Sequence, residues 1–382
     1  MPEDQPVASG AESEPPLEFN YKAGWWIARI LTKENKVAEA NAAYEALLKR
    51  FPKPNDLDKR LYEWARLNHD NEQYVQADAV WRRLVKDVPL SPLANNAKLH
   101  LAESDLIADK FEEARKAFEE LAISDKSADE IKERSLYQLV VLAVGQQRWN
   151  DVQTTGDRLT TEFPKSTYRH YVGYGQVELL LAKPKNTEEE IATARDLLRP
   201  LLAEPVTDEI KNEDWYDRLW VLSAELSFRE KKYADVLAVV EQLKSRNPKS
   251  PYLYQAEEVL GRSFKQQAKF DDARAAFERV LSNPFANRTE TAAKSQFMIG
   301  ETYLHQEKWS LAFVAYQKVY SLYKFPEWQA AGLLMSARCD EQQNEWKPAV
   351  ETYKRLIQEF PKFSQIEDAK SGLAAAQKRA AE

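Results

Sequence analysis

The 382-residue chain has a single cysteine, Cys339. One cysteine excludes an intramolecular disulfide and leaves the redox compartment open. The chain also lacks an apolar run near the roughly 18 residues of a membrane-spanning helix, and it begins without the basic and apolar segment of a secretion signal. We therefore expect no direct membrane insertion. The expected compartment is the cytoplasm, or the periplasm and cell envelope if a signal or anchor has been removed.

An excess of positive charge is also absent, because 54 basic residues face 61 acidic ones. Five of the acids lie in the first twenty residues: Glu3, Asp4, Glu12, Glu14 and Glu18. The rest of the chain is nearly neutral, which argues against the basic surface that nucleic-acid backbones require. Residues 1–16 carry four prolines and no base, and they are predicted to be a disordered leader.

Groupings of catalytic or metal-binding residues are scarce. His69, His100, His170 and His305 are far apart in sequence, and none lies in a zinc-binding frame. Arg338 beside Cys339 could lower the pKa of the thiol, but the position fits a small packing residue better. The segment "NTEEE" at 186–190 has the composition of a helix start. We predict no catalytic residue, no metal, no cofactor and no small-molecule substrate.

What the chain does contain is a recurring helical phrase, such as "KFDDARAAFERVLSNP" at 269–284. Asp271 is predicted to cap the start of this helix. Ala273, Phe277 and Val280 then form an apolar stripe at helical spacing, and Pro284 ends the helix. An isolated helix of this length is marginal in water, so the stripe needs a partner surface.

The phrase occurs nine times. Its small or slim residue lies at Ala40, Ala77, Ala114, Val152, Ala194, Val236, Ala273, Ala312 and Ala349, at spacings of 37 to 42 residues. Twelve residues earlier, eight copies have a second small or slim residue: Ala28, Ala65, Ala102, Val140, Ala224, Gly261, Gly300 and Ala337. Each copy therefore predicts a helix A and a helix B that cross closely. The fifth copy is irregular, because Gly175 comes early and "AKPKNTEEE" looks inserted.

Two copies match a known consensus closely. "VLGRSF" at 259–264 precedes "ARAAF" at 273–277, and "MIGETY" at 298–303 precedes "AFVAY" at 312–316. With these motifs, residues 17–362 resemble the tetratricopeptide repeat. The resemblance implies an all-α, right-handed α-solenoid of about nine helix-turn-helix units. The Pro-x-Ser linkers are similar to those of bacterial cell-envelope repeat proteins, such as the outer-membrane assembly lipoprotein and the Tol-Pal coordinator.

The predicted organisation has four parts. After the leader at 1–16, residues 17–206 hold units one to five and residues 207–362 hold units six to nine. Residues 363–382 are predicted to form a capping helix with Ile366, Ala369, Leu373 and Ala376 on one side.

The resemblance also implies a binding surface on helix A, where residues that do not pack inward line a concave groove. The residues selected on this basis are Trp25, Arg29, Tyr62, Arg66, Tyr137, Arg262, Phe297 and Arg338. An apolar track flanked by charge suits a peptide or a partner protein. Leu99, Val221 and Leu334 occupy the same register, but packing against their own neighbours is equally expected there.

Two functional hypotheses follow. The first is a non-catalytic scaffold or adaptor that holds a protein partner in the groove, within an envelope assembly complex. The alternative is a structural spacer, or a solenoid that self-associates through its faces or ends; an enzyme ranks third. The Lys and Asn residues that clamp chaperone tails in some repeats have no counterpart at these positions, so this binding mode is not predicted.

Overall fold

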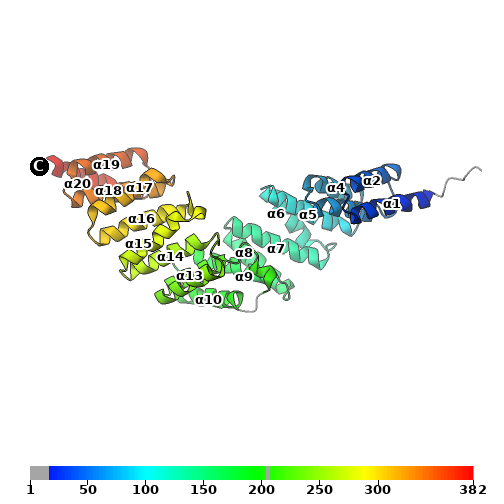
Figure 1. Cartoon of the computed structure of the whole chain (residues 1–382), viewed down its shortest axis with the longest axis horizontal. Helices are drawn as coiled ribbons and strands as arrows, with labels where there is room; N and C mark the ends of the chain where they lie inside the picture. The colour runs from blue at the N-terminus through cyan, green and yellow to red at the C-terminus, as the bar shows by residue number, and fades with distance from the viewer. Residues whose placement is uncertain (1–16, 204–206, 382) are drawn as a thin grey trace, which may run out of the picture. The chain divides into compact units, whose positions relative to one another are not determined.

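The computed structural model describes residues 17–203 and 207–381, and all regular elements within them are helical. The predicted leader at 1–16 lies outside the described residues. The chain divides into two compact units, residues 1–172 and 173–382, here called the amino-terminal and carboxy-terminal units. Figure 1 shows that consecutive helices in each unit run back and forth as hairpins. This all-α repeat architecture confirms the predicted fold class.

The helices of the amino-terminal unit are α1 (Leu17–Lys33), α2 (Val37–Arg50), α3 (Leu57–Asp70), α4 (Tyr74–Asp87), α5 (Leu93–Ile107), α6 (Phe111–Ile123), α7 (Asp129–Gly145) and α8 (Trp149–Glu162). Helix α9 (Arg169–Ala182) contains the division between the units. The carboxy-terminal unit continues with α10 (Glu188–Leu202), α11 (Asp208–Lys211), α12 (Arg218–Arg229), α13 (Tyr233–Arg246), α14 (Leu253–Gln266), α15 (Phe270–Ser282), the 3₁₀ turn η1 (Pro284–Ala286), α16 (Glu290–His305), α17 (Trp309–Leu322), α18 (Pro326–Gln342), α19 (Trp346–Glu359) and α20 (Ile366–Ala381).

Small residues at the helix crossings hold each hairpin together, as the sequence predicts. The two small positions of the first hairpin, Ala28 and Ala40, are both fully buried. At Gly300 an added Cβ would lie 2.6 Å from Cε1 of Tyr316, which is itself fully buried. The paired helices therefore approach closely where the sequence has its small residues.

The turns between helices A and B share one backbone conformation. Eight hairpins place a residue with φ between 55° and 60° two positions before helix B, for example Ala268. The next residue donates its N–H to a carbonyl five residues back, as Lys269 does to Phe264 at 3.0 Å. Such turns usually take glycine, yet none is used at these positions. The positions of glycine in the sequence therefore do not indicate these turns.

The prediction that Asp271 caps α15 is wrong. The helix begins at Phe270, and the cap position is Lys269, whose carbonyl accepts from Ala273 N–H at 2.9 Å. The preceding left-handed turn leads the chain straight into the helix, so a side-chain cap is not needed. Asp271 lies in the first turn and pairs with Arg274, where its charge still complements the helix dipole.

The Pro-x-Ser linkers have a structural role at the start of helix A. Leu93 N–H donates to Ser91 Oγ at 3.0 Å, and Tyr168 N–H donates to Ser166 Oγ at 3.1 Å. Ser91 also donates to Asp58 Oδ2 at 2.6 Å, which ties the linker to α3. The linker motif thus fixes the entry of the chain into the next helix.

The fifth hairpin differs from the others in the way the sequence indicates. The segment between α9 and α10 is longer than the other turns, and Thr187 starts α10 with a reciprocal capping box to Glu190. Arg229 of α12 binds this segment by donating to the carbonyls of Leu181 at 2.6 Å and Lys183 at 2.8 Å. The inserted residues are therefore held against the neighbouring repeat.

Helix α20 packs against α19 as an additional helix. Ala369 and Ala376 are fully buried in the same cluster as Tyr353 and Leu356. Ile366 and Leu373 are partly buried against it. The apolar side of α20 thus covers the last hairpin of the described chain.

Candidate functional site

In the amino-terminal unit, the first of the predicted helix-A binding residues is Trp25 on α1. Its ring lies below the Arg60 guanidinium at 4.0 Å, and its Nε1 donates to Glu63 Oε2 at 2.9 Å. Arg60 is buried and pairs with both Glu63 and Asp56 at 2.7 Å. Burial alone would raise the pKa of Asp56, but hydrogen bonds from Tyr21 and Arg60 outweigh it and lower the pKa. Trp25 is thereby fixed between α1 and α3 with its ring half-buried.

Tyr62 on α3 is the next aromatic residue of the predicted helix-A surface. Its half-buried ring meets the fully buried Trp81 edge-on, with centroids 5.1 Å apart. Arg66 lies one helical turn further on, is half exposed, and pairs only locally with Asp70 at 3.1 Å. Arg29 occupies the equivalent position on α1, 5.3 Å from the Trp25 ring, and no carboxylate in the described residues pairs with it. Both arginines therefore keep charge available to a partner.

Tyr137 on α7 is part of a cluster of three tyrosines. It stacks on Tyr168 with centroids 4.2 Å apart and meets Tyr171 edge-on at 5.4 Å. These rings pack against the buried core of the unit. The helix-A register predicts Tyr137 but not Tyr168 or Tyr171, because both of these follow the Pro-x-Ser linker.

In the carboxy-terminal unit the selected Arg262 is held by internal ion pairs. Its guanidinium pairs with Glu225 of α12 and with Glu258 at 2.9 Å, and it covers the Phe228 ring at 4.5 Å. Glu258 is only 5% exposed and also pairs with Lys294 at 2.9 Å. These contacts form a ladder that joins successive helices A. Little of the Arg262 charge is left for an external ligand.

Phe297 and Arg338 have intermediate exposure. Phe297 lies between Tyr316 at 5.0 Å and Trp328 at 5.4 Å, measured between ring centroids. Arg338 approaches Asp368 of α20 at 3.7 Å. By contrast, Leu99, Val221 and Leu334 are buried in the core. Their burial favours packing against their own neighbours over lining the groove.

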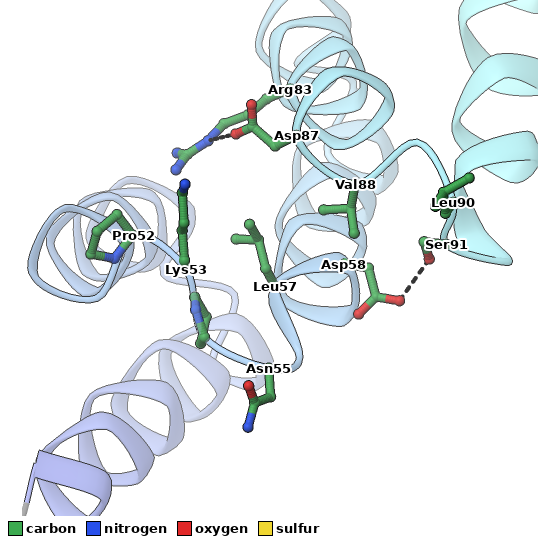
Figure 2. Close-up of a pocket in the computed structure, with 11 residues that line it drawn as sticks. Pro52, Lys53, Asn55, Leu57, Asp58, Arg83, Asp87, Val88, Leu90 and Ser91 are labelled. Atoms are coloured by element: carbon green, nitrogen blue, oxygen red, sulfur yellow. Dashed lines mark hydrogen bonds and ion pairs between the residues drawn. The ribbon is translucent and has the colours of Figure 1, made fainter.

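The amino-terminal unit also has a pocket that the sequence does not predict (Figure 2). It has a volume of about 760 Å³ and lies between the segment around Lys53 and the segment around Leu90. Its polar groups largely satisfy each other, since Arg83 pairs with Asp87 at 3.2 Å and Asp58 accepts from Ser91. None of the selected residues lines it. Lys53 and Asp58 both line the pocket, and neither forms an ion pair among the described residues.

Cys339 fits a packing role. It is fully buried, and burial raises the pKa of its thiol to about 12, with the neighbouring Asp340 adding to the shift. A thiol in this state is not a nucleophile at neutral pH. The described residues contain no group of three or more histidine, cysteine or acidic side chains that could hold a metal. In the same residues no helix is both long and apolar enough to cross a bilayer.

Asp340 is a buried carboxyl whose removal should stabilise the protein. Burial raises its pKa to about 6, the charge of Glu345 adds to the shift, and Oδ2 has no hydrogen-bond partner among the described residues. Since the folded pKa lies above the ordinary value, ionisation at higher pH weakens the fold. At pH 7.5 we expect Asp340→Asn to raise the free energy of unfolding by roughly 1–3 kcal/mol. Urea denaturation should show this gain shrinking as pH falls through 6 toward 4; a pH-independent difference would contradict the assignment.

Together the fold and the helix-A face define an all-α helical-repeat protein. The tetratricopeptide repeat-like domain model matches residues 126–297, and the tetratricopeptide repeat model matches residues 22–54 and 331–362. The two models together cover more than half of the chain. The chain is therefore a tetratricopeptide-repeat protein.

Solved structures agree on the fold. A tetratricopeptide repeat protein from Parabacteroides merdae is 16% identical with a TM-score of 0.50, and the match covers 74% of this chain and 99% of that one. A signal transduction ATPase with numerous domains and a tetratricopeptide repeat sensor, from Pyrococcus horikoshii, is 14% identical with a TM-score of 0.57. That match covers 88% of this chain and 54% of the other, so the chain spans about half its length. No curated protein matches the sequence.

Proposed function

We propose that the protein is a non-catalytic scaffold that binds a partner protein or peptide through the helix-A face of its amino-terminal unit. The observation that carries the proposal is the set of half-buried aromatic rings at Trp25 and Tyr62 with Arg29 and Arg66 beside them. Tryptophan, tyrosine and arginine dominate the energetics of protein interfaces. Their rings are already positioned by neighbouring helices, so little side-chain entropy remains to be lost on binding.

The carboxy-terminal unit fits a structural role better. Arg262, Glu225 and Glu258 satisfy one another across successive helices A, and Lys265 pairs with Glu301 in the same way. A partner would have to break these pairs before it could use their charges. Phe297 and Arg338 remain secondary candidates for binding because both keep intermediate exposure. The internal ion pairs support a spacer function for the carboxy-terminal unit, alongside partner binding by the amino-terminal unit.

The proposal is tested by affinity capture from native extract with the wild-type protein and three variants. We expect Tyr62→Ala and Arg66→Glu each to weaken binding of the partner at least about tenfold, as loss of an interface hot spot does. Arg82→Glu is the matched control, because Arg82 is 59% exposed on α4, the helix B of the same hairpin. Circular dichroism should show all variants folded. Equal recovery of the same partners with every variant would contradict the proposal.

A place in a bacterial envelope assembly complex is the finer form of the proposal. It is supported only by the resemblance of the Pro-x-Ser linkers, and Ser91 and Ser166 also have a capping role that any compartment would permit. The compartment of the captured partner tests it: envelope proteins would support this form, and cytoplasmic partners alone would exclude it while leaving the scaffold function intact.

A further inference from the structure

Helix α1 exposes a continuous apolar face. Phe19, Trp26, Ile27 and Ile30 are each at least half exposed, at 63, 50, 56 and 50%. They recur at helical spacing together with Ala23, so they lie along one side of the helix. Apolar residues scattered singly on a surface need no explanation, whereas a contiguous stripe of four large ones indicates a contact surface.

The repeat register shows which contact is unfilled. Residues 64 and 67 of α3 lie 37 positions after Ile27 and Ile30, as Ala65 lies 37 positions after Ala28. In α3 both residues pack on the preceding helix B, where Trp64 stacks on Tyr44 and Leu67 is only 4% exposed. The equivalent isoleucines on α1 have no such helix among the described residues. The face is therefore shaped to receive one more helix.

We propose that a second copy of this chain covers this face, with the two α1 helices packed antiparallel. A two-fold axis near Trp26 and Ile27 places Ala23 of one copy opposite Ile30 of the other, so a small residue faces a large one. Such a self-complementary patch is what a symmetric dimer requires. The two copies would bury on each other the isoleucines that are exposed in one copy.

Charge favours the antiparallel arrangement. The segment 1–16 joins the start of α1 and contains four acids and no base. The other end of α1 carries Arg29 and Lys33, and no described carboxylate pairs with either. Antiparallel packing places the start of α1 in each copy, to which the acidic segment is joined in sequence, beside the basic end of the other copy, whereas parallel packing places the two starts together.

The segment 1–16 has too few apolar residues to cover the apolar face of α1 by itself. Apart from its prolines, Met1 and Val7 are its only apolar residues larger than alanine. Two such side chains cannot cover four large apolar ones. The dimer face adjoins the proposed partner site, because the Trp26 ring lies 4.7 Å from the Trp25 ring and 5.5 Å from the Arg29 guanidinium. Ile27, however, lies about 200° around the helix from Trp25 at 3.6 residues per turn.

Sedimentation equilibrium of the full chain over a range of concentrations tests the proposal. We expect the wild-type protein to dimerise and Ile27→Glu/Ile30→Glu to weaken the dimer at least tenfold. The matched control is Ile107→Glu/Ile123→Glu, which changes two isoleucines exposed at 80 and 69% elsewhere in the same unit and should leave the dimer unchanged. A monomeric wild-type protein, or a dimer that is unaffected by Ile27→Glu/Ile30→Glu or equally weakened by the control, would overturn the proposal.

A cysteine variant tests the face without introducing a charge. Ile27→Cys should form a covalent dimer on mild oxidation, because its copies lie near the two-fold axis. Ile107→Cys should not. The natural Cys339 is fully buried and should remain unreactive in both. Absence of the cross-link at position 27, or equal cross-linking at 107, would count against the antiparallel α1 interface even if the protein dimerises by another route.

Discussion

Arg262→Ala is expected to lower the free energy of unfolding by about 3 kcal/mol. Breaking a buried ion pair costs about 3–5 kcal/mol, because it leaves the partner charge buried and uncompensated. Here the substitution removes the Arg262 guanidinium that pairs with Glu225 and with Glu258, which is 5% exposed. The lower end of the range applies, because Lys294 still pairs with Glu258 and Arg229 with Glu225, both at 2.9 Å. Urea denaturation at neutral pH measures the change.

Arg66→Ala is the matched control for this prediction. Arg66 occupies the same repeat position as Arg262, one residue after the small residue of helix A. Its side chain is 50% exposed and its pair with Asp70 is local, so we expect a change within about 0.5 kcal/mol. Equal effects of the two substitutions would show that the ladder does not stabilise the carboxy-terminal unit.

The ladder also predicts a pH dependence. Burial would raise the pKa of Glu225, but Arg262 and Arg229 outweigh it and lower the pKa. A carboxyl with a lowered folded pKa stabilises the protein above its ordinary pKa, and the contribution is lost as pH falls through the folded value. The difference between wild type and Arg262→Ala should therefore shrink on acidification below about pH 4.5.

Gly261→Leu is expected to cost at least about 1–3 kcal/mol, the range for overpacking a core. A Cβ at this position would lie 2.6 Å from Cδ1 of Phe277, a side chain that is itself fully buried. Helices α14 and α15 would have to separate to admit the larger residue. Thermal or urea denaturation should show the loss, and a neutral effect would mean that Gly261 is not at a helix crossing.

Gly145→Ala provides the comparison. A Cβ at Gly145 would meet nothing within 4 Å, and the residue ends α7. Because alanine is the better helix former, we expect no loss of stability and a small gain. A loss as large as that of Gly261→Leu would mean that glycine is required in these helices for a reason other than close packing.

The sequence was sufficient to predict the repeats because small and large side chains recur at fixed positions in each repeat. Helix B begins three residues before the small position in eight hairpins, as at Tyr74 before Ala77 and Trp309 before Ala312. Small residues such as Ala65 are buried where two helices cross. These features depend on local periodicity and on packing between neighbours, both of which recur along the chain.

The site was less predictable because it depends on contacts between repeats. The register that selects Arg66 also selects Arg262, yet one is exposed and the other is enclosed by Glu225 and Glu258. Only the positions of the preceding and following helices distinguish them. The left-handed turns at residues such as Ala268 were missed for another reason, since they use side chains that rarely adopt this conformation.

The most direct test of the proposed scaffold function is photo-cross-linking in the native cell from two positions of one hairpin. A photoreactive aromatic residue replaces Tyr62 on helix A or Val75 on helix B, which is 81% exposed. We predict that position 62 cross-links to a discrete partner protein and that position 75 does not. Cross-linking from position 75 with none from position 62 would contradict binding through the helix-A face.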